Sequence, residues 1–196
     1  MQLRLPRHLP SRSAGVISSV VSGLPFRTAS PIFLSVRPEL TAHRGKLLTG
    51  CADKGTPVHA GGFLQQRRIV LESRLFANPP LLRLILTHEL FHFAWPRIGI
   101  PSRAGFANLV ADELTGKARG ELGESAAVSK DNLLACHSIQ QQRRYFRHYL
   151  CEAFCDTGAF LYSGVETSEH FTLARRWVAR RTSWFQGGIN WESRCF

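Results

Sequence analysis

The longest apolar pattern in the chain runs from residue 79 to residue 94. Its apolar residues fall on nearly every side of a helical projection, which predicts a helix that lies deep in the fold. Asn78 and Pro79 supply an N-cap residue followed by proline at the first helical position, and Pro96 ends the pattern. This segment is therefore expected to be the central helix of the protein.

Shorter patterns predict the remaining elements. Runs rich in β-branched residues predict strands at residues 32–36, 46–49 and 67–72. Helical spacing predicts helices at residues 106–119 and 139–162, and a last helix that is capped by Thr167 or Ser168 and carries Phe171 to Val178. Residues 55–62 have turn composition and residues 120–130 resemble an exposed loop. Together these elements predict the α+β class.

The first 30 residues differ in composition from the rest. They are rich in Pro, Ser and Arg, show no clear period, and precede the first acidic residue, Glu39. We expect residues 1–30 to form a flexible basic arm and residues 31–196 to form a single domain. A transit peptide remains an alternative for such a start, whereas the apolar run from Ala14 to Val21 is too short for a secretory signal.

Composition narrows the function classes. The 196 residues carry a net charge of +11, but the arginines are dispersed, and neither zinc-finger spacing nor a long Lys run is present. Nucleic acid is therefore not favoured as the main partner. No stretch approaches the length of a membrane span. Five cysteines in spacings that match no disulfide framework favour reduced thiols and a cytoplasmic location.

Candidate chemistry lies near the end of the central helix, in the sequence His88-Glu89-Leu90-Phe91-His92. Residues i and i+4 share a helical face, so His88 and His92 can bind one zinc ion while Glu89 deprotonates a water molecule. About 0.02 such HExxH motifs are expected by chance in a chain of this composition. The alternative is a pair of core histidines that are hydrogen-bonded to backbone groups.

A catalytic zinc ion requires a third protein ligand. A metzincin would have Gly at position 95 and His at position 98, but these positions hold Trp95 and Ile98. The helix at residues 139–162 offers Glu152 as the ligand and Asp156, one turn later, as the acceptor for the free N–H of a ligating imidazole. The alternative is an amphipathic helix whose two acids face solvent.

The oxyanion donor is less well determined. His148, one turn before Glu152, is a candidate third ligand and a candidate oxyanion donor. Four further residues could act as that donor, and the sequence does not choose among Tyr145, Tyr149, His137 and His170.

The pairing of His88-Glu89-x-x-His92 with Glu152-x-x-x-Asp156 resembles the gluzincin pattern of thermolysin-like peptidases, and is similar to compact bacterial zincin-like metallopeptidases. The resemblance implies zinc ligands at His88, His92 and Glu152, with Glu89 as general base. It also implies a zincin-like fold, in which a small sheet packs on the active-site helix and a mostly helical C-terminal half follows. Its edge strand would line the cleft, and we expect residues 67–72 to form that strand.

The leading hypothesis is therefore a zinc-dependent peptidase that acts on a peptide or protein substrate. A non-catalytic zincin-like regulatory protein is the first alternative, although a purely structural zinc site normally has four protein ligands. A basic nucleic-acid-associated protein is the second, and salt-dependent binding to DNA would support it. The polar residues 101–130 are expected to form either a lid over the cleft or a surface loop.

Overall fold

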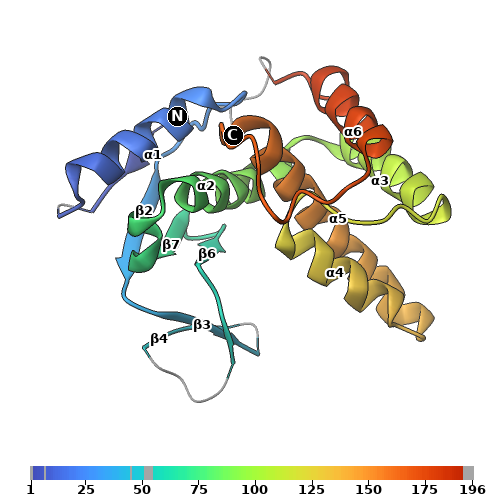
Figure 1. The fold of residues 1–196 in the computed structure, drawn as a ribbon, viewed down its shortest axis with the longest axis horizontal. Helices are drawn as coiled ribbons and strands as arrows, with labels where there is room; N and C mark the ends of the chain where they lie inside the picture. The colour runs from blue at the N-terminus through green and yellow to red at the C-terminus, as the bar shows by residue number, and fades with distance from the viewer. Residues whose placement is uncertain (1, 7, 45, 51–54, 192–196) are drawn as a thin grey trace.

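The computed structural model describes residues 2–6, 8–44, 46–50 and 55–191, in which α and β structure are mixed (Figure 1). Strands occupy the first half of the chain and helices dominate the second, as the α+β prediction requires. The elements are β1 (Leu3–Arg4), α1 (Ser11–Gly23), β2 (Ile32–Arg37), β3 (Leu40–His43), β4 (Lys46–Thr49), β5 (Thr56–Pro57), β6 (Ala60–Phe63), β7 (Arg68–Glu72), α2 (Pro79–Ala94), α3 (Ile100–Thr115), α4 (Glu124–Leu134), α5 (Ile139–Tyr162) and α6 (Arg175–Gly187), with 3-10 turns at Ser73–Ala77 and Trp95–Arg97.

The main sheet has the strand order β1-β2-β7-β6. The first three strands are parallel and β6 pairs antiparallel with β7. The prediction that residues 67–72 form the edge strand is therefore wrong, because β7 lies inside the sheet and its last four residues are buried. A continuous apolar run is typical of such an interior strand. The edge strands are β1 and β6, and β6 is the edge strand that lines the cleft described below; its Gly61 and Gly62 conceal the strand pattern in the sequence.

A second sheet, with the order β4-β3-β5, projects from the main sheet on the side away from α1 (Figure 1). Its strands are all antiparallel. Leu47 of β4 covers Gly61 so closely that a Cβ atom on the glycine would lie 3.0 Å from a Leu47 methyl carbon. The glycine therefore allows the small sheet to pack against the edge of the main sheet.

The N-terminal segment is not the flexible arm that we expected. Residues 3–4 form β1, and residues 11–23 form α1, which packs on α2. Ile17 and Val20 are each only 1% exposed, so the helix buries an apolar stripe against the core. The serines between these two residues obscured a helical spacing that is nevertheless present. Cys51 and Cys195, expected to be reduced thiols, lie outside the described residues.

Helix α2 is the centre of the fold and crosses α5 (Figure 1). Its predicted cap is present, since the Asn78 side chain accepts a hydrogen bond from the backbone N–H of Leu81 at 3.2 Å. At the crossing, a Cβ atom on Gly158 would lie 2.5 Å from the ring of Phe91, so glycine is what brings the two helices together. The ring of Phe91 also contacts Phe26 and Phe154.

Residues 101–130 are largely helical, and the exposed loop expected at residues 120–130 is wrong. Helix α3 begins at residue 100 instead of residue 106, and α4 occupies residues 124–134. The last helix, α6, begins at residue 175, later than the expected caps. None of the helices in the described part of the chain combines the length and apolar composition that a membrane crossing requires.

Buried ion pairs hold this polar region in place. The Arg181 guanidinium of α6 is fully buried, and its Nη2 atom lies 2.9 Å from Glu121 Oε2 and also contacts Glu113 of α3. Lys130 Nζ lies 2.9 Å from Glu121 Oε1, and the Tyr149 hydroxyl donates a hydrogen bond to the same oxygen atom. The polar sequence looked like surface because its charges are paired inside the protein.

Replacing Arg181 should therefore destabilise the fold strongly. Arg181→Met leaves the buried Glu113 carboxylate without a counter-charge and leaves Glu121 with Lys130 alone, and we expect a loss of about 3–5 kcal/mol in the free energy of unfolding. Arg180→Met is the matched control, because Arg180 pairs with Asp112 in an exposed position and such pairs contribute about 0–1 kcal/mol. Urea unfolding measures both variants, and equal losses would contradict the assignment.

Candidate metal centre

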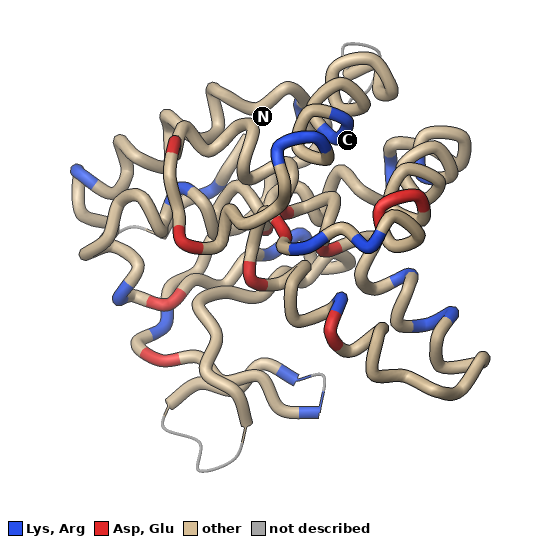
Figure 2. Tube along the Cα trace, turned by 45° about the vertical axis from the view of Figure 1, so that its right-hand side comes forward, with Lys and Arg blue, Asp and Glu red and all other residues tan. Residues whose placement is uncertain are grey.

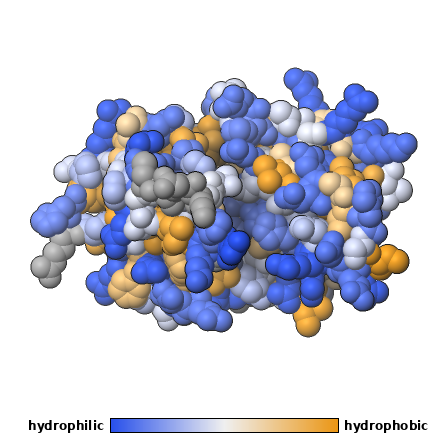
Figure 3. All heavy atoms as spheres, turned by 90° about the horizontal axis from the view of Figure 1, so that it is seen from below, coloured by the Kyte–Doolittle hydropathy of each residue, from blue (hydrophilic) through white to orange (hydrophobic). Residues whose placement is uncertain are grey.

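The HExxH residues line an open cleft of about 840 Å³ (Figure 3). Helix α2 contributes His88, Glu89 and His92, while α5 contributes His148 and Glu152. Residues 56–62, from β5 to β6, and the first turns of α4 form other walls. The cleft thus lies between the strands and the C-terminal helices, and the candidate residues from two helices meet in it.

His88 is held in one orientation by Asp156. Its Nδ1 atom lies 2.6 Å from Asp156 Oδ1, and Asp156 Oδ2 accepts a hydrogen bond from the backbone N–H of Ala126 at 2.8 Å. A carboxylate partner places the proton of a neutral imidazole on Nδ1. The Nε2 lone pair of His88 is then directed toward His92 and Glu152.

Three electron-pair donors converge beside the cleft. His88 Nε2 lies 3.0 Å from His92 Nε2 and 3.3 Å from Glu152 Oε2, and the His92 nitrogen lies 3.7 Å from the same oxygen. Tetrahedral zinc with bonds of about 2.0–2.2 Å separates its ligand atoms by about 3.4 Å. The three atoms therefore fit one small tetrahedral cation, and without a proton or a cation they would repel one another.

The charges around His88 and His92 favour the protonated, positively charged forms of these two side chains. Burial alone would lower the pKa of His88, but Asp156 and Glu152 outweigh it and hold the pKa well above its usual value. The pKa of His92 is also raised, since its contact with Cys151 and the Glu152 charge outweigh burial. Burial would raise the pKa of Glu152, but the two histidines lower it to about 2. The carboxylate is therefore ionised at neutral pH.

Glu89 lies next to these donors with one oxygen atom unused. Its side chain is 8% exposed, and Oε2 is buried without a hydrogen-bond partner in the described structure. A Cβ atom on Gly62 of β6 would lie 2.8 Å from this oxygen, so the edge strand closes over Glu89. An ionised oxygen without a partner is costly to bury unless a ligand or water contacts it.

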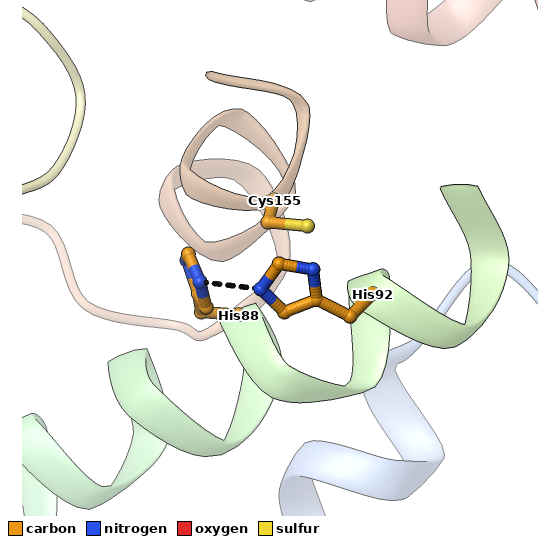
Figure 4. Close-up of side chains that lie close together, drawn as sticks. All are labelled: His88, His92 and Cys155. Atoms are coloured by element: carbon orange, nitrogen blue, oxygen red, sulfur yellow. Dashed lines mark hydrogen bonds between the residues drawn. The ribbon is translucent and has the colours of Figure 1, made fainter. Parts of the chain in front are cut away.

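Two cysteines of α5, Cys151 and Cys155, provide further donors near His92, and Figure 4 shows Cys155 beside the two histidines. The nitrogen, oxygen or sulfur atoms of His88, His92 and Cys155 lie within 4.8 Å of one another, as do those of His92, Cys151 and Glu152. Cys151 Sγ lies 3.4 Å from His92 Nδ1, and contacts with Cys155 and His92 lower the pKa of this thiol to about 6. Neither cysteine lines the cleft; Cys155 is buried and Cys151 is partly buried.

Among the candidate oxyanion donors, only His148 lines the cleft. His148 lines the cleft, with Nε2 3.7 Å from Glu152 Oε1 and Nδ1 3.0 Å from Ser129 Oγ. Tyr149 is buried and bonded to Glu121. Outside the lining of this cleft lie Tyr145, His137 and His170.

Sequence reasoning missed His59, which lines the cleft opposite α4 and has Nδ1 2.9 Å from Glu72 Oε2. Its glycine-rich surroundings indicated only a turn, so no signal in the sequence pointed to it.

Comparisons of the chain with protein-family models, curated proteins and solved structures return no match. The chemistry of the site is therefore judged from its own geometry. That geometry defines a centre whose described donor groups can hold a metal ion beside an open cleft.

Metal binding should release protons at neutral pH. Because the pKa of His88 is raised, the metal-free ring stays protonated at pH 7, and a metal ion must displace that proton. Affinity should fall as the pH drops through the raised value, while Glu152 stays ionised. We expect release of about one proton or more per ion, measured by zinc titration calorimetry in buffers of different ionisation enthalpy. Asp156→Asn removes the main group that raises the pKa and should reduce the release; heats independent of buffer would contradict the assignment.

Proposed function

We propose that the protein is a zinc-dependent peptidase with a zincin-like fold and a gluzincin-type centre. One observation carries the proposal: the ligand atoms of His88, His92 and Glu152 converge at tetrahedral spacing on the wall of an open cleft that Glu89 also lines. A structural site would not need a cleft, and a buried histidine pair would not need an unpartnered glutamate.

Zinc is the metal that best suits these donors. Two imidazoles and one carboxylate favour zinc over magnesium or calcium, which prefer all-oxygen sites. Three protein ligands leave a position on the cleft side for water or substrate. A zinc ion held there would polarise a peptide carbonyl and lower the pKa of the attacking water.

The residues of the chain then divide the remaining tasks. Glu89, which lines the cleft, would accept the proton of the attacking water and deliver it to the leaving amine. Asp156 keeps the Nδ1 proton of His88 in place, so that Nε2 remains a ligand. His148 projects into the cleft from α5, with Ser129 on its Nδ1 atom, and is the best-placed donor to a developing oxyanion.

The free edge of β6 suggests how a peptide lies in the cleft. In the described sheet β6 pairs only with β7, and Ala60, Gly61 and Gly62 line the cleft. An extended peptide can add to such an edge through backbone hydrogen bonds. Gly62, which lacks a side chain, brings the β6 backbone close to Glu89, so a peptide added at this edge would lie near that residue; this favours extended polypeptide segments as substrates.

A non-catalytic metal-binding protein is the second candidate. Cys155 and Cys151 offer further donors near His92, and a fourth protein ligand would close the coordination shell. In that case the ion would only brace α2 against α5. The intact Glu89 in an open cleft favours the peptidase.

Zinc binding should depend on Glu152. Glu152→Gln removes the ligand charge, and we expect the zinc affinity to fall at least about 100-fold, by analogy with the losses caused by weakening a metal's ligand environment. Glu124→Gln is the matched control, because Glu124 lines the same cleft but is not one of the three proposed ligands, His88, His92 and Glu152, whose donor atoms we call the donor triangle. Metal content after dialysis, measured by mass spectrometry, distinguishes the variants. Full retention of zinc by Glu152→Gln would transfer the third-ligand role to another residue, such as His148 or a cysteine.

Catalysis should depend on Glu89 separately from metal binding. Glu89→Gln keeps the shape of the side chain but cannot accept a proton, so cleavage should slow by about 10²–10⁴-fold with zinc content unchanged. Cleavage of an unstructured protein, followed by mass spectrometry of the fragments, measures this effect. A zinc-loaded parent protein that cleaves no peptide across a broad peptide library would favour the non-catalytic alternative.

A further inference from the structure

Helix α4 and the first half of α5 form a hairpin that projects from the rest of the molecule (Figure 1). The two helices pack along each other. Residues 137–145 are nevertheless exposed, and Phe146 is the first residue of α5 that is even partly buried. We call residues 134–139, where the chain turns from α4 into α5, the hairpin tip. The tip is therefore a surface that the fold presents to its surroundings.

The hairpin tip carries two large apolar side chains, one on each side of the turn. Leu134 is 64% exposed and Ile139 is 75% exposed. Together with Ile100, they are the most exposed large apolar side chains in the described part of the chain. A single exposed apolar residue is ordinary, but two at one projecting end form a surface that gains free energy when a partner removes it from water.

Behind the tip, the exposed side of α5 is basic. Ile139, Arg143 and Arg147 follow one another at helical spacing on one face, and Arg144 lies beside them. All three arginines are exposed, and none pairs with an acidic group in the described part of the chain. The sequence has no acidic residue from 132 to 151. The first turn of α5 also lacks a side-chain cap, so the positive end of the helix dipole adds to this charge.

An anionic bilayer is the partner that matches both features. Arginines contact lipid phosphates, and the region below the headgroups accepts short apolar side chains. A nucleic acid would pair with the arginines but would leave Leu134 and Ile139 in water. A protein partner requires about 800 Å² on each side for a stable interface, which a narrow projecting turn does not offer.

We propose that the hairpin tip docks the protein on membranes that contain anionic lipid. Leu134 and Ile139 enter the bilayer below the headgroups, while Arg143, Arg144 and Arg147 contact the lipid phosphates. Such a contact is peripheral and reversible, because only two apolar side chains are buried. The inference stands apart from the proposed peptidase function, since no residue of the donor triangle takes part in it.

The same hairpin connects the tip with the cleft. Ser129 of α4 and His148 and Glu152 of α5 line the cleft. Glu152 lies about 20 Å from Ile139 along the helix, so docking holds the cleft within about that distance of the membrane. Combined with the proposed peptidase function, this position favours polypeptides at a membrane surface as substrates.

Vesicle co-sedimentation of the whole chain, with metal removed, tests the docking. The protein should bind vesicles of phosphatidylcholine and phosphatidylglycerol in about equal parts. Binding to phosphatidylcholine alone should be about 100-fold weaker, because each of the arginines strengthens binding to an anionic surface by about fivefold. High salt should reduce the difference. Equal affinity for the two kinds of vesicle, or no binding to either, would overturn the proposal.

Removing charge behind the tip should weaken this binding. Arg143→Gln with Arg144→Gln should lower the affinity for anionic vesicles by about 30-fold. Arg12→Gln with Arg175→Gln is the matched control, since it removes the same charge from exposed arginines on α1 and α6. Losses of equal size in the two double variants would show that net charge alone attracts the protein, and would overturn the assignment to the hairpin.

The apolar contact has a closely matched control. Ile139 and Ile100 are both 75% exposed, and each is the first residue of a helix. Ile139→Asn should lower the affinity for anionic vesicles by about tenfold, whereas Ile100→Asn should leave it unchanged. Both side chains are exposed, so neither change should affect folding, which circular dichroism checks. Equal affinities of the two variants would contradict insertion of the tip.

A labelled oligonucleotide distinguishes the membrane from a nucleic acid. If the oligonucleotide binds at least as tightly as the vesicles, and only the Arg143→Gln and Arg144→Gln variant weakens it, the hairpin binds nucleic acid and the proposal is wrong. The outcome is also separate from that of the proposed function. Tip-dependent vesicle binding by a protein that binds no zinc would support docking and defeat the peptidase, and a zinc-loaded peptidase that binds no vesicles would do the reverse.

Discussion

The contact on which the arrangement of the site depends is the Asp156 carboxylate, buried where α2, α4 and α5 meet. One oxygen atom receives His88 and the other receives the backbone N–H of Ala126 at the start of α4. A Cβ atom on Gly123 would lie 2.2 Å from the carboxylate carbon, so the chain turns into α4 directly against it. A single side chain therefore fixes the orientation of an imidazole and the start of a helix.

This contact requires that α2 and α5 approach closely, and Gly158 allows it. The glycine lies two residues after Asp156 and places the α5 backbone on the ring of Phe91. Because Phe91 immediately precedes His92, the same crossing that packs the core also brings both histidines to Glu152. The geometry of the donor triangle is in this sense a result of core packing, which explains why it is held by the interior of the protein and not by flexible loops.

The acidic and the basic residues of this strongly basic chain differ in where they lie in the structure. Several of the 14 acidic residues are buried and serve internal roles, among them Glu72, Glu89, Glu113, Glu121 and Asp156. Lys and Arg are instead spread over many helices and strands (Figure 2). Much of the negative charge is thus used to neutralise Arg181 and Lys130 or to surround the two histidines. The net charge of +11 counts buried and exposed residues alike, so the burial of these acids leaves the surface richer in positive charge than the acidic and basic totals alone suggest.

The sequence predicted those helices and strands whose apolar spacing matches the face that they bury in the fold. Helices α2 and α5 and strands β2, β4 and β7 have clear spacing, and the prediction of these elements is confirmed. Helices α1 and α4 were missed because serines interrupt the apolar spacing of α1 and because buried charges in and before α4 resemble surface residues. The glycines of β6 hid the edge strand in the same way. Helical spacing predicted that Glu152 and Asp156 share one face of α5, and the need of a zinc site for a third ligand, with the family resemblance, predicted that they lie near the histidines. The positions of His59 and the cysteine donors depend on segments that meet only in the folded chain.

The energetics of the metal-free centre argue for a ligand as strongly as its geometry does. Two imidazole nitrogens and a carboxylate oxygen face one another within 3.7 Å, and the Oε2 atom of Glu89 is buried without a hydrogen-bond partner in the described structure. Without a metal ion, only a proton on His88, whose pKa is raised, relieves the repulsion among the three donor atoms, and the Glu89 oxygen loses its hydration. A fold that needed only stability would replace them with apolar side chains. Their retention beside an open cleft is what a functional site requires, since a bound cation and a substrate would convert each of these costs into a favourable contact.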